Sequence, residues 1–334
     1  FNSRADNVQL QQAWLYAEKA IDTSCGFDIG GRVDYMYGTD SQDTQAFGTD
    51  PRGWDNGWDN GPDYGRAMPQ LYVEAGYGDL SVKAGHFFTI IGWEVVTAPD
   101  NFFYSHAYTM YNSEPFTHTG VLASYNVNDT ITAYGGYTMG WDSGFDDNGD
   151  NFLGGLSAGL TDDFTLTYAT TIGRFGSLPL GTPEQGYMQS LVGDLAVTDN
   201  LQYIIQSDFL DSDNGVSTVR ETFGINQYLI YSLNDCVSVG TRFEWWQVQK
   251  DSQGYYGDNS VIPANAAVGG NFDVYALTFG LNYKPHANVV IRPEIRGDWV
   301  QGLSEQDYAA ADISLLEDNR DSQCTFGIDT IFLF

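Results

Sequence analysis

From residue 27 to the end of the chain, hydrophobic and polar residues alternate with a period of two, the pattern of extended β-strands. Fourteen such segments can be traced, most of them about 9 to 13 residues long, which is the length that a tilted strand needs to cross a bilayer. Gly, Asp and Asn residues separate many of the segments, as expected for turns. The predicted strands span residues 27–37, 67–77, 80–89, 119–127, 130–141, 151–161, 163–173, 186–197, 200–211, 219–232, 235–249, 271–285, 287–300 and 322–334.

The first residues follow a different pattern. Within residues 7–22, Leu10, Trp14, Ala17 and Ile21 recur at helical spacing, which predicts a short amphipathic helix. We therefore expect two regions: an N-terminal segment, 1–26, which carries this helix and serves as a plug or a periplasmic cap, and a strand-rich domain, 27–334.

The links between the predicted strands alternate in length. The links after the even-numbered strands are turns of a few residues, such as Gly78-Asp79 and Asn234-Asp235, whereas those after the odd-numbered strands are longer. An up-and-down barrel that spans a membrane has short turns at one rim and long loops at the other. An even number of strands also returns the chain to the rim where it began. The pattern predicts an all-β, closed, antiparallel transmembrane barrel of about fourteen strands with a short N-terminal helix.

Charged and apolar residues occupy opposite faces of the predicted strands. In residues 287–300, Val289, Ile291 and Ile295 share one face, and Arg292 and Glu294 lie on the other. A barrel of fourteen strands is too wide for its side chains to fill, so its interior must hold water or a plug. We therefore expect the charged face to point inward and the apolar face to meet lipid, where closure leaves no unpaired edge.

One segment resembles a known family. The stretch LYVEAGYGDLSVKAGHFFTIIGWE, residues 71–94, has a strand, a short glycine turn, a KAG-x-F strand and an IG-aromatic-E loop in that order. This order is similar to the early hairpin of the family named Putative beta-barrel porin-2, whose members are porin-like outer-membrane β-barrels. The resemblance implies an outer-membrane channel. It rests on Tyr72, Glu74, Gly78, Lys83, Ala84, Gly85, Phe87, Ile91, Gly92, Trp93 and Glu94.

The charge balance restricts the partners. Asp and Glu number 44 against 14 Lys and Arg, for a formal net charge of −30. Nucleic acids are therefore not expected partners, because phosphate binding needs clustered basic residues. Most of the excess acid lies in the long links, which should concentrate cations at that rim. We expect membrane lipid, small hydrophilic solutes and ions as partners, and the apolar outer face would permit a homotrimer.

The scarce basic residues gather on the predicted lumen face, together with carboxylates. Two interpretations are compatible: a transverse field across a water-filled constriction, or a salt-bridge network that stiffens the wall. The predicted pore-lining residues are Arg32, Arg66, Lys83, Arg242, Arg292, Arg296, Glu74, Glu244, Glu294 and Asp298.

The second long link, residues 90–118, is rich in aromatic residues, which an exposed loop would show to water. We expect it to fold into the barrel as a constriction loop and to present Glu94, Asp100 and Glu114 to the lumen.

Other chemistry is weakly indicated. Asp146, Asn148 and Asp150 resemble calcium ligands, but the terminal glutamate of a complete calcium loop is missing, so no cofactor is expected beyond calcium at the acidic loops. Cys25, Cys236 and Cys324 show no metal spacing. The four histidines are scattered and no HExxH or CxxC pattern occurs, so we predict no enzyme. A Ser-His-Asn hydrolase, whose residues would meet only in space, is the enzymatic alternative.

The predicted function is an outer-membrane porin, a passive diffusion channel for small hydrophilic solutes that prefers cations. Two alternatives stay open: a transporter for hydrophobic compounds, and a surface-structural or adhesive barrel with a closed lumen. The first residues lack the basic and apolar regions of a secretion signal, as expected after its removal. The last strand places Phe326, Ile328, Phe332 and Phe334 on one face, which we assign to lipid at the periplasmic rim, with the long loops outside.

Overall fold

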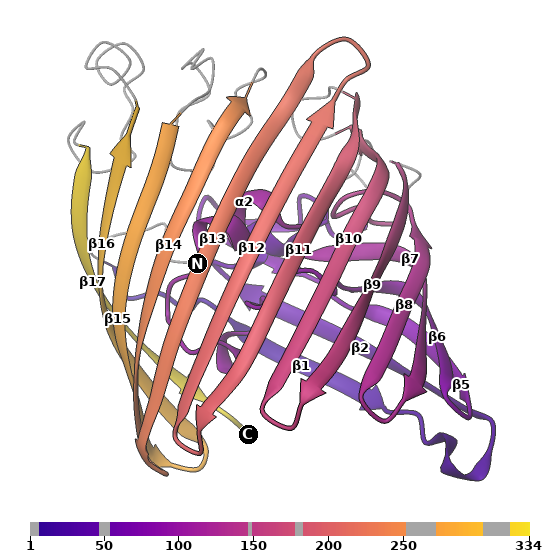
Figure 1. The fold of residues 1–334 in the computed structure, drawn as a ribbon, viewed down its shortest axis with the longest axis horizontal. Helices are drawn as coiled ribbons and strands as arrows, with labels where there is room; N and C mark the ends of the chain where they lie inside the picture. Colours follow the sequence, from indigo (N-terminus) through magenta and orange to yellow (C-terminus); the bar gives the residue numbers. More distant parts are fainter. Residues whose placement is uncertain (1–6, 47–53, 146–148, 178–182, 252–271, 303–320) are drawn as a thin grey trace.

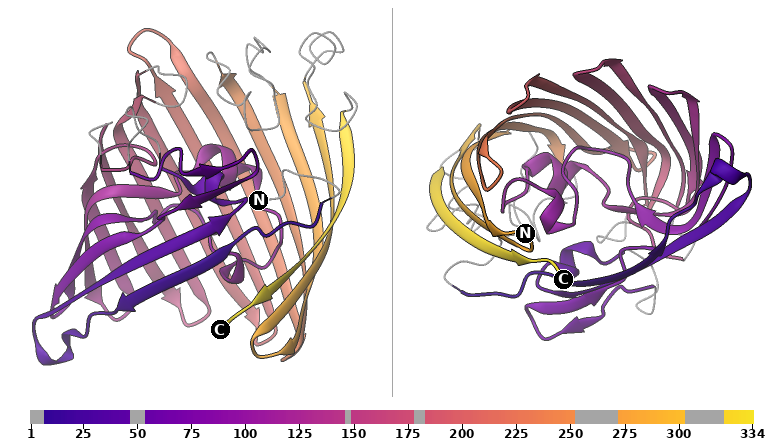
Figure 2. Two further views of the ribbon diagram at one scale, coloured as in Figure 1. Left: turned by 180° about the vertical axis from the view of Figure 1, so that it is seen from behind. Right: turned by 90° about the horizontal axis from the view of Figure 1, so that it is seen from below.

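The computed structural model describes the chain apart from residues 1–6, 47–53, 146–148, 178–182, 252–271 and 303–320. The described residues form one antiparallel sheet of 17 strands, which curls round into a barrel-shaped wall (Figures 1 and 2). No helix within these limits is long and apolar enough to cross a membrane.

The strands are β1 (Ala13–Lys19), β2 (Asp28–Gly38), β3 (Asp59–Asn60), β4 (Tyr64–Ala67), β5 (Leu71–Tyr77), β6 (Leu80–Phe88), β7 (Thr117–Asn128), β8 (Ile131–Thr138), β9 (Asp150–Thr161), β10 (Phe164–Ser177), β11 (Pro183–Thr198), β12 (Leu201–Asp213), β13 (Thr218–Asn234), β14 (Val237–Asp251), β15 (Phe272–His286), β16 (Val289–Gln301) and β17 (Ser322–Phe332). The helices are short: η1 (Thr23–Cys25), α1 (Ser41–Thr44), η2 (Ala98–Asp100) and α2 (Tyr108–Ser113).

Each of the fourteen predicted strands has a counterpart, and β1, β3 and β4 are additional. The predicted N-terminal helix is wrong, because residues 13–19 form a strand that pairs with β2. Its inward side chains contact those of β2: Trp14 Nε1 donates to Asp34 at 3.0 Å, and the Arg32 guanidinium lies 4.4 Å from the Tyr16 ring centroid. The helical spacing of apolar residues was coincidental, and cross-strand partners that local sequence does not reveal decided the conformation.

The strand β2 pairs with other strands along both of its edges. One edge of β2 pairs with β1, and the other pairs with β5 and β4. From β5 to β17 each strand pairs with the next, always antiparallel. Counted round the wall, β1 and β17 therefore run in the same direction, and the ladders described for these two strands do not join them. Closure of the barrel, and an even strand number, are not confirmed.

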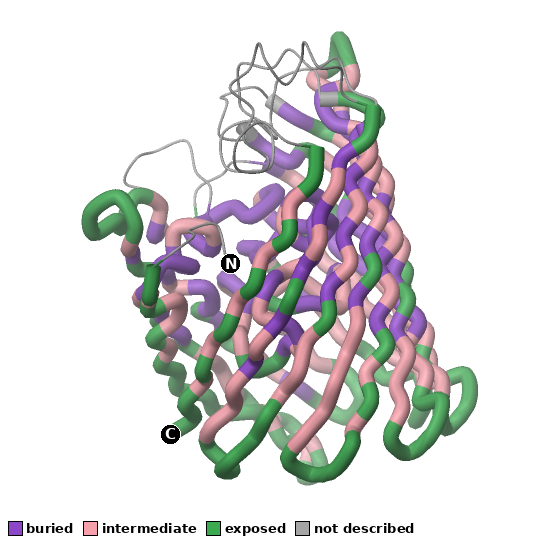
Figure 3. Tube along the Cα trace, turned by 90° about the vertical axis from the view of Figure 1, so that its left-hand side faces the viewer, coloured by how far each residue is buried: buried purple, intermediate pink, exposed green. Residues whose placement is uncertain are grey.

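The two faces of the wall have the predicted character. In β17, Phe326, Ile328 and Phe332 are 72%, 58% and 68% exposed on the outside, whereas Asp329 on the other face pairs with Arg292. In β14, Arg242 and Glu244 point inward and are fully buried. Buried residues accordingly concentrate on the inner side and in the upper half of the wall (Figure 3). A soluble barrel would show the reverse arrangement.

The link between β6 and β7, residues 89–116, lies inside the curled sheet (Figure 2). It includes η2 and α2, and α2 contacts β12, β13 and β14 on the far side of the barrel from β6. The predicted infolding of this link is therefore confirmed. We refer to residues 89–116 as the inner loop.

A disulfide can test the strand assignment of the N-terminal region. Ala17 and Val33 are directly opposite each other in the β1–β2 ladder, where Cβ atoms lie about 4.5–5.5 Å apart. In a chain whose Cys25, Cys236 and Cys324 are replaced by serine, we expect Ala17→Cys with Val33→Cys to form a disulfide, detected by mass spectrometry. Ala17→Cys with Ile29→Cys, offset by four residues, should stay reduced. Equal oxidation of the two pairs would contradict the register.

Candidate functional site

The inner loop is fastened first by one arginine of the wall. Arg242 of β14 donates from Nη1 to Glu94 Oε1 (2.8 Å) and to the carbonyl of Ser105 (2.6 Å), and from Nη2 to Ser105 Oγ (2.9 Å) and to the carbonyl of His106 (3.3 Å). Its Nε donates to Glu244 of the same strand at 2.7 Å. All five N–H groups of this buried guanidinium are thus satisfied, and most of their acceptors lie in the inner loop.

Carboxylates of the wall accept from the backbone of the inner loop. Glu294 Oε2 of β16 accepts from the N–H groups of Tyr104 (2.9 Å) and Ser105 (3.1 Å). Glu244 Oε2 accepts from the Tyr108 N–H at 2.7 Å, at the start of α2. Loop backbone that would otherwise be buried without partners is satisfied in this way.

Two further arginines of β16 reach the same loop. Arg292 donates to the carbonyls of Ala98 (2.8 Å) and Asn101 (2.7 Å), and it forms an ion pair with Asp329 of β17. Arg296 donates to the carbonyl of His106 at 2.8 Å and to Asp298 at 2.6 Å. The basic sector that the sequence predicts thus exists, but the acceptors that it meets are loop carbonyls and neighbouring carboxylates.

Neutral groups make further contacts between the inner loop and β12, β13 and β14. Gln206 Oε1 accepts from the Trp93 N–H at 3.0 Å. Ser113 Oγ lies 2.9 Å from Thr222 Oγ1 and accepts from Trp246 Nε1 at 2.9 Å. The inner loop is therefore held along its length, by arginines near η2 and, near α2, by neutral groups together with the Glu244 carboxylate.

Glycines of the wall make room for inner-loop side chains. A Cβ at Gly240 would lie 2.5 Å from Phe102 Cε1, and one at Gly280 would lie 3.0 Å from the Phe103 ring. Gly224 faces Thr109 in the same way, and Gly327 faces Tyr104. We call Gly224, Gly240, Gly280 and Gly327 the wall glycines. Because each faces inward on a strand whose outer face is apolar, they form shallow seats for the loop.

Two inner-loop carboxyls have opposite electrostatic settings. Burial alone would raise the pKa of Glu94, but Arg242 and the hydrogen bond from His106 Nδ1 (3.0 Å) outweigh it and lower the pKa to about 2. Burial, with the nearby Asp208 carboxyl of β12, raises the pKa of Glu114 well above its ordinary range. The first carboxyl is an anion held by the Arg242 guanidinium and the His106 hydrogen bond, and the second favours its neutral form.

The remaining predicted pore-lining residues fall in two groups. Arg32 pairs with Asp34 (2.6 Å) and Glu18 (3.3 Å), and Lys83 lies opposite Glu74 with its Nζ 4.3 Å from the Tyr72 ring centroid, all on the inward face. Arg66 is the exception: it is exposed and lies opposite Tyr37, on the outer face. The prediction for Arg66 is wrong because it treats residue 66 as continuous with the strand that follows. The strand is interrupted between Ala67, the end of β4, and Leu71, the start of β5, so the alternation of inward and outward side chains in β5 does not extend to Arg66.

Of the three predicted loop carboxylates, Glu94 and Glu114 are buried against the wall, whereas Asp100 is exposed at the end of η2 and accepts from Thr97 Oγ1 at 2.5 Å.

The other predicted chemistry finds little support. Asp146 and Asn148 of the calcium candidate lie outside the described residues, and Asp150 pairs with Arg174. Among the residues that the structure describes, no group of three or more His, Cys, Asp or Glu could hold a metal ion. One GxSxG sequence, residues 155–159, lies in the middle of β9, where Ser157 Oγ lies 3.0 Å from Thr167 Oγ1. It is not the strand-to-helix turn that this motif needs for nucleophilic catalysis.

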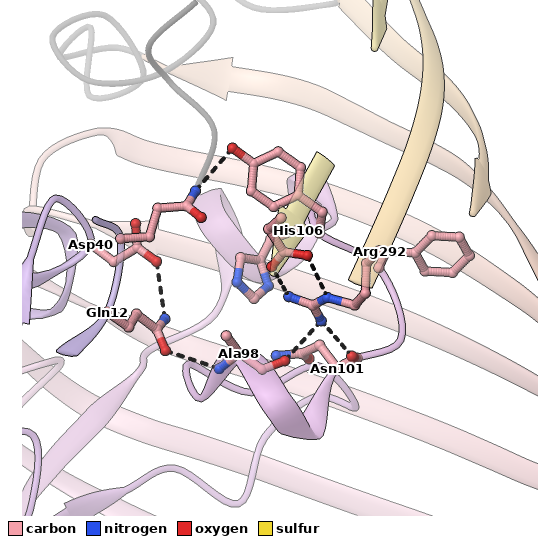
Figure 4. A pocket seen from close by; sticks show the side chains of 10 residues that line it. Gln12, Asp40, Ala98, Asn101, His106 and Arg292 are labelled. Atoms are coloured by element: carbon pink, nitrogen blue, oxygen red, sulfur yellow. Dashed lines mark hydrogen bonds and ion pairs between the residues drawn. The ribbon is translucent and has the colours of Figure 1, made fainter. Parts of the chain in front are cut away.

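A small cavity lies where η2 meets β1 and β16 (Figure 4). Its volume, about 10 Å³, corresponds to one water molecule. Gln12 donates to Asp40 (3.0 Å) and accepts from the Ala98 N–H (3.0 Å), and Arg292 borders the other side. The cavity is therefore a gap within the loop anchorage, too small for a solute.

Sequence reasoning missed the residues that receive α2, namely Gln206, Asp208, Thr222, Asn226 and Trp246. A signal was present, because polar residues and glycines recur at the inward positions of β12 to β15. Inward polarity by itself, however, is also what a water-filled lumen would show.

A family model described as "Putative beta-barrel porin-2, OmpL-like" matches residues 1–334. The chain belongs to this family. The resemblance of residues 71–94 is thereby confirmed. The family and the fold are those of a porin-like barrel of the outer membrane, in agreement with the sequence prediction.

Solved structures share the fold at low sequence identity. Vibrio cholerae OmpT, folded in vitro, is 14% identical, with a TM-score of 0.59 over 97% of this chain and 95% of that one. Salmonella typhi OmpF in complex with daunomycin is 12% identical, with a TM-score of 0.60 over 98% and 93%. An anion-selective porin from Comamonas acidovorans is 9% identical, with a TM-score of 0.57 over 87% and 79%. No curated protein matches the sequence.

The contact between the wall glycines and the inner loop can be tested by mutation. Gly240→Ala places a methyl group against Phe102, and we expect it to lower the free energy of unfolding by about 1–3 kcal/mol. Phe102→Ala in the same chain should recover part of this loss, which a double-mutant cycle measures from unfolding in detergent. Gly297→Ala is the matched control, because its Cβ would meet its nearest atom only at 3.9 Å. Equal losses at the two glycines would contradict the proposed fit.

The depressed pKa of Glu94 predicts acid sensitivity. Because the folded pKa of about 2 lies below the ordinary value of 4.5, the stabilisation is complete above about pH 4.5 and is lost as the pH falls toward 2. We expect this loss to be roughly 1–3 kcal/mol, measured as melting temperature in detergent from pH 7 to 2. Glu94→Gln should be less stable at neutral pH and lose less on acidification. An unchanged acid slope in the variant would show that other carboxyls are responsible.

Proposed function

We propose that the protein is a passive diffusion channel for small hydrophilic solutes and ions in the bacterial outer membrane, and that it prefers cations. Family membership and the porin-like fold support a channel in general. The cation preference rests on one observation about the inward arginines: each is paired with carboxylates.

The pairing is extensive. Arg32, Arg220, Arg242, Arg292 and Arg296 all form ion pairs with Asp or Glu. A guanidinium whose charge is matched at 2.5–2.8 Å presents little net positive field to a passing anion. The excess of acidic over basic residues in the whole chain then dominates the potential at the mouth and along the lumen.

The orientation follows the sequence pattern. We propose that the long links lie outside the cell and that the short turns and the C-terminus lie in the periplasm. The exposed aromatic residues at the end of β17 support an anchor at the periplasmic membrane boundary. One V. cholerae OmpT structure is a trimer form, and the apolar outer wall would allow the present chain to form a homotrimer as well.

Of the two alternatives, the transporter for hydrophobic compounds relied on a plug formed by an N-terminal helix, and residues 13–19 are instead a strand of the sheet. The adhesive barrel with a closed lumen is favoured by the tight packing of the inner loop.

Planar bilayers separate the channel from the adhesive barrel. We expect stepwise, ohmic conductance, and a reversal potential in a KCl gradient that shows cations to be more permeant. Silence of a correctly folded preparation would exclude the channel, and an anion-directed reversal potential would exclude the selectivity.

Asp100 offers a local test, because it is the exposed carboxylate of the inner loop. We expect Asp100→Asn to lower the cation-to-anion permeability ratio by roughly two- to threefold. Asp129→Asn removes an equal charge from the exposed turn between β7 and β8 and should leave the ratio nearly unchanged. If the two variants behave alike, Asp100 does not face the ion path.

A further inference from the structure

Two buried carboxyl groups meet at the C-terminal end of the inner loop. Glu114 Oε1 and Asp208 Oδ2 each accept a hydrogen bond from the same atom, Gln206 Nε2, at 2.6 Å. The two residues are 4% and 1% exposed. One belongs to the inner loop and the other to β12, so their interaction joins the loop to the wall.

None of the ion pairs of the described residues gives Glu114 or Asp208 a cationic partner. Among the described residues, the charged groups that act most strongly on Glu114 are the carboxyls of Asp208 on β12 and of Glu94 within the inner loop, and the Tyr228 hydroxyl of β13 also interacts with it. Arg242, which holds the other part of the inner loop, is engaged with Glu94 and Glu244. Two ionised carboxylates in such a place would repel each other at high cost, so one of them should retain its proton.

The local geometry leaves little freedom to separate the groups. Glu114 Oε2 packs so closely against Gly92 that a Cβ atom at position 92 would overlap it. The side chain of Gln206 is held in place because its Oε1 accepts a hydrogen bond from the Trp93 N–H. Asp208 Oδ1 has no hydrogen-bond partner, which leaves it open to accept from a protonated neighbour.

We propose that Glu114 and Asp208 share one proton, and that this shared proton is a latch that fastens residues 108–116 of the inner loop to β12. When the pH rises, the proton leaves to water or hydroxide, both carboxyls become anions, and their repulsion releases this part of the loop. The latch itself needs only the fold. Its consequence, a wider lumen at alkaline pH, rests on the proposed channel function.

The release is confined to one part of the inner loop. Residues 94–106 are held by Arg242, Arg292 and Arg296, whose guanidinium groups stay charged at any accessible pH. Among the hydrogen bonds described for residues 108–116, none comes from an arginine. Their two ends are held by the Tyr108 N–H on Glu244 and by the Phe116 N–H on Asp142. Between these ends they are held by Ser113, by Thr109, which accepts from Asn226, by the Tyr111 hydroxyl on Asp43, and by the acid pair. The two parts should therefore respond differently to the same change of pH.

Thiol labelling can measure the release. Ser113 is 1% exposed, so Ser113→Cys should react slowly with a maleimide while the loop is in place. Cys25 and Cys324 are replaced by serine, and the exposed Cys236 is kept as the internal reference for the reactivity of a thiol at each pH. We expect the rate at residue 113, relative to Cys236, to rise about tenfold between about pH 6 and pH 9.

Two glutamine variants identify the group responsible. Glu114→Gln keeps the shape and a hydrogen-bond donor to Asp208 but cannot ionise, so the relative rate should stay low across the range. Glu74→Gln removes an inward carboxyl that lies opposite Lys83 on the β5–β6 ladder. In this control variant the relative labelling rate at residue 113 should still rise with pH. The latch would be overturned if the relative labelling rate still rises with pH in Glu114→Gln. It would also be overturned if the rate does not rise in the chain that keeps Glu114.

A second measurement covers the case in which Ser113→Cys fails to fold. Hydrogen exchange of residues 108–116 in the unaltered chain, corrected for the intrinsic effect of pH, should lose protection at alkaline pH relative to residues 94–106. Uniform protection would overturn the latch. Bilayer recordings then distinguish the channel proposal from the latch proposal. Loop release without any conductance would contradict the channel but not the latch. Conductance without loop release would contradict the latch but not the channel.

Discussion

The buried guanidinium of Arg242 is the interaction on which the rest of the interior depends. Its five N–H groups meet Glu94, Glu244, Ser105 and His106, so one side chain of the wall fixes both the charge and the backbone of the inner loop. Removing one partner from a buried ion pair typically costs about 3–5 kcal/mol, because the other charge remains buried without compensation. The path of the inner loop is thus set by the need to satisfy these charges.

Steric fit complements the electrostatics. The wall glycines lie at inward positions on β13, β14, β15 and β17, and side chains from Phe102 to Thr109 occupy the space that a Cβ would fill. The ion pairs determine where the inner loop crosses the lumen, and the wall glycines determine how closely the loop approaches the wall. The same arrangement leaves a cavity of only about 10 Å³ beside η2.

The overall negative charge and the basic lumen sector are compatible once pairing is considered. The arginines of β14 and β16 attract attention in the sequence because basic residues are scarce, yet each is matched by carboxylates of the wall or the loop. Their structural role is to hold the inner loop. The unmatched charge of the molecule is acidic, and the proposed cation preference rests on that excess.

The sequence alone determined the wall. Alternation with period two predicted fourteen strands, each of which has a counterpart, and it identified the apolar outer face, because in a strand the direction of a side chain depends only on its parity. It also placed Arg242, Arg292, Arg296, Glu244 and Glu294 on the inner face. It failed where parity is broken or local preference is weak: Arg66, beyond the break between β4 and β5, and residues 13–19, whose strand exists because β2 offers an edge. Only the tertiary structure decided which inward groups meet. Glu114 and Asp208 are 94 positions apart in the chain, and no local pattern reveals that the inner loop crosses the barrel to bring them together.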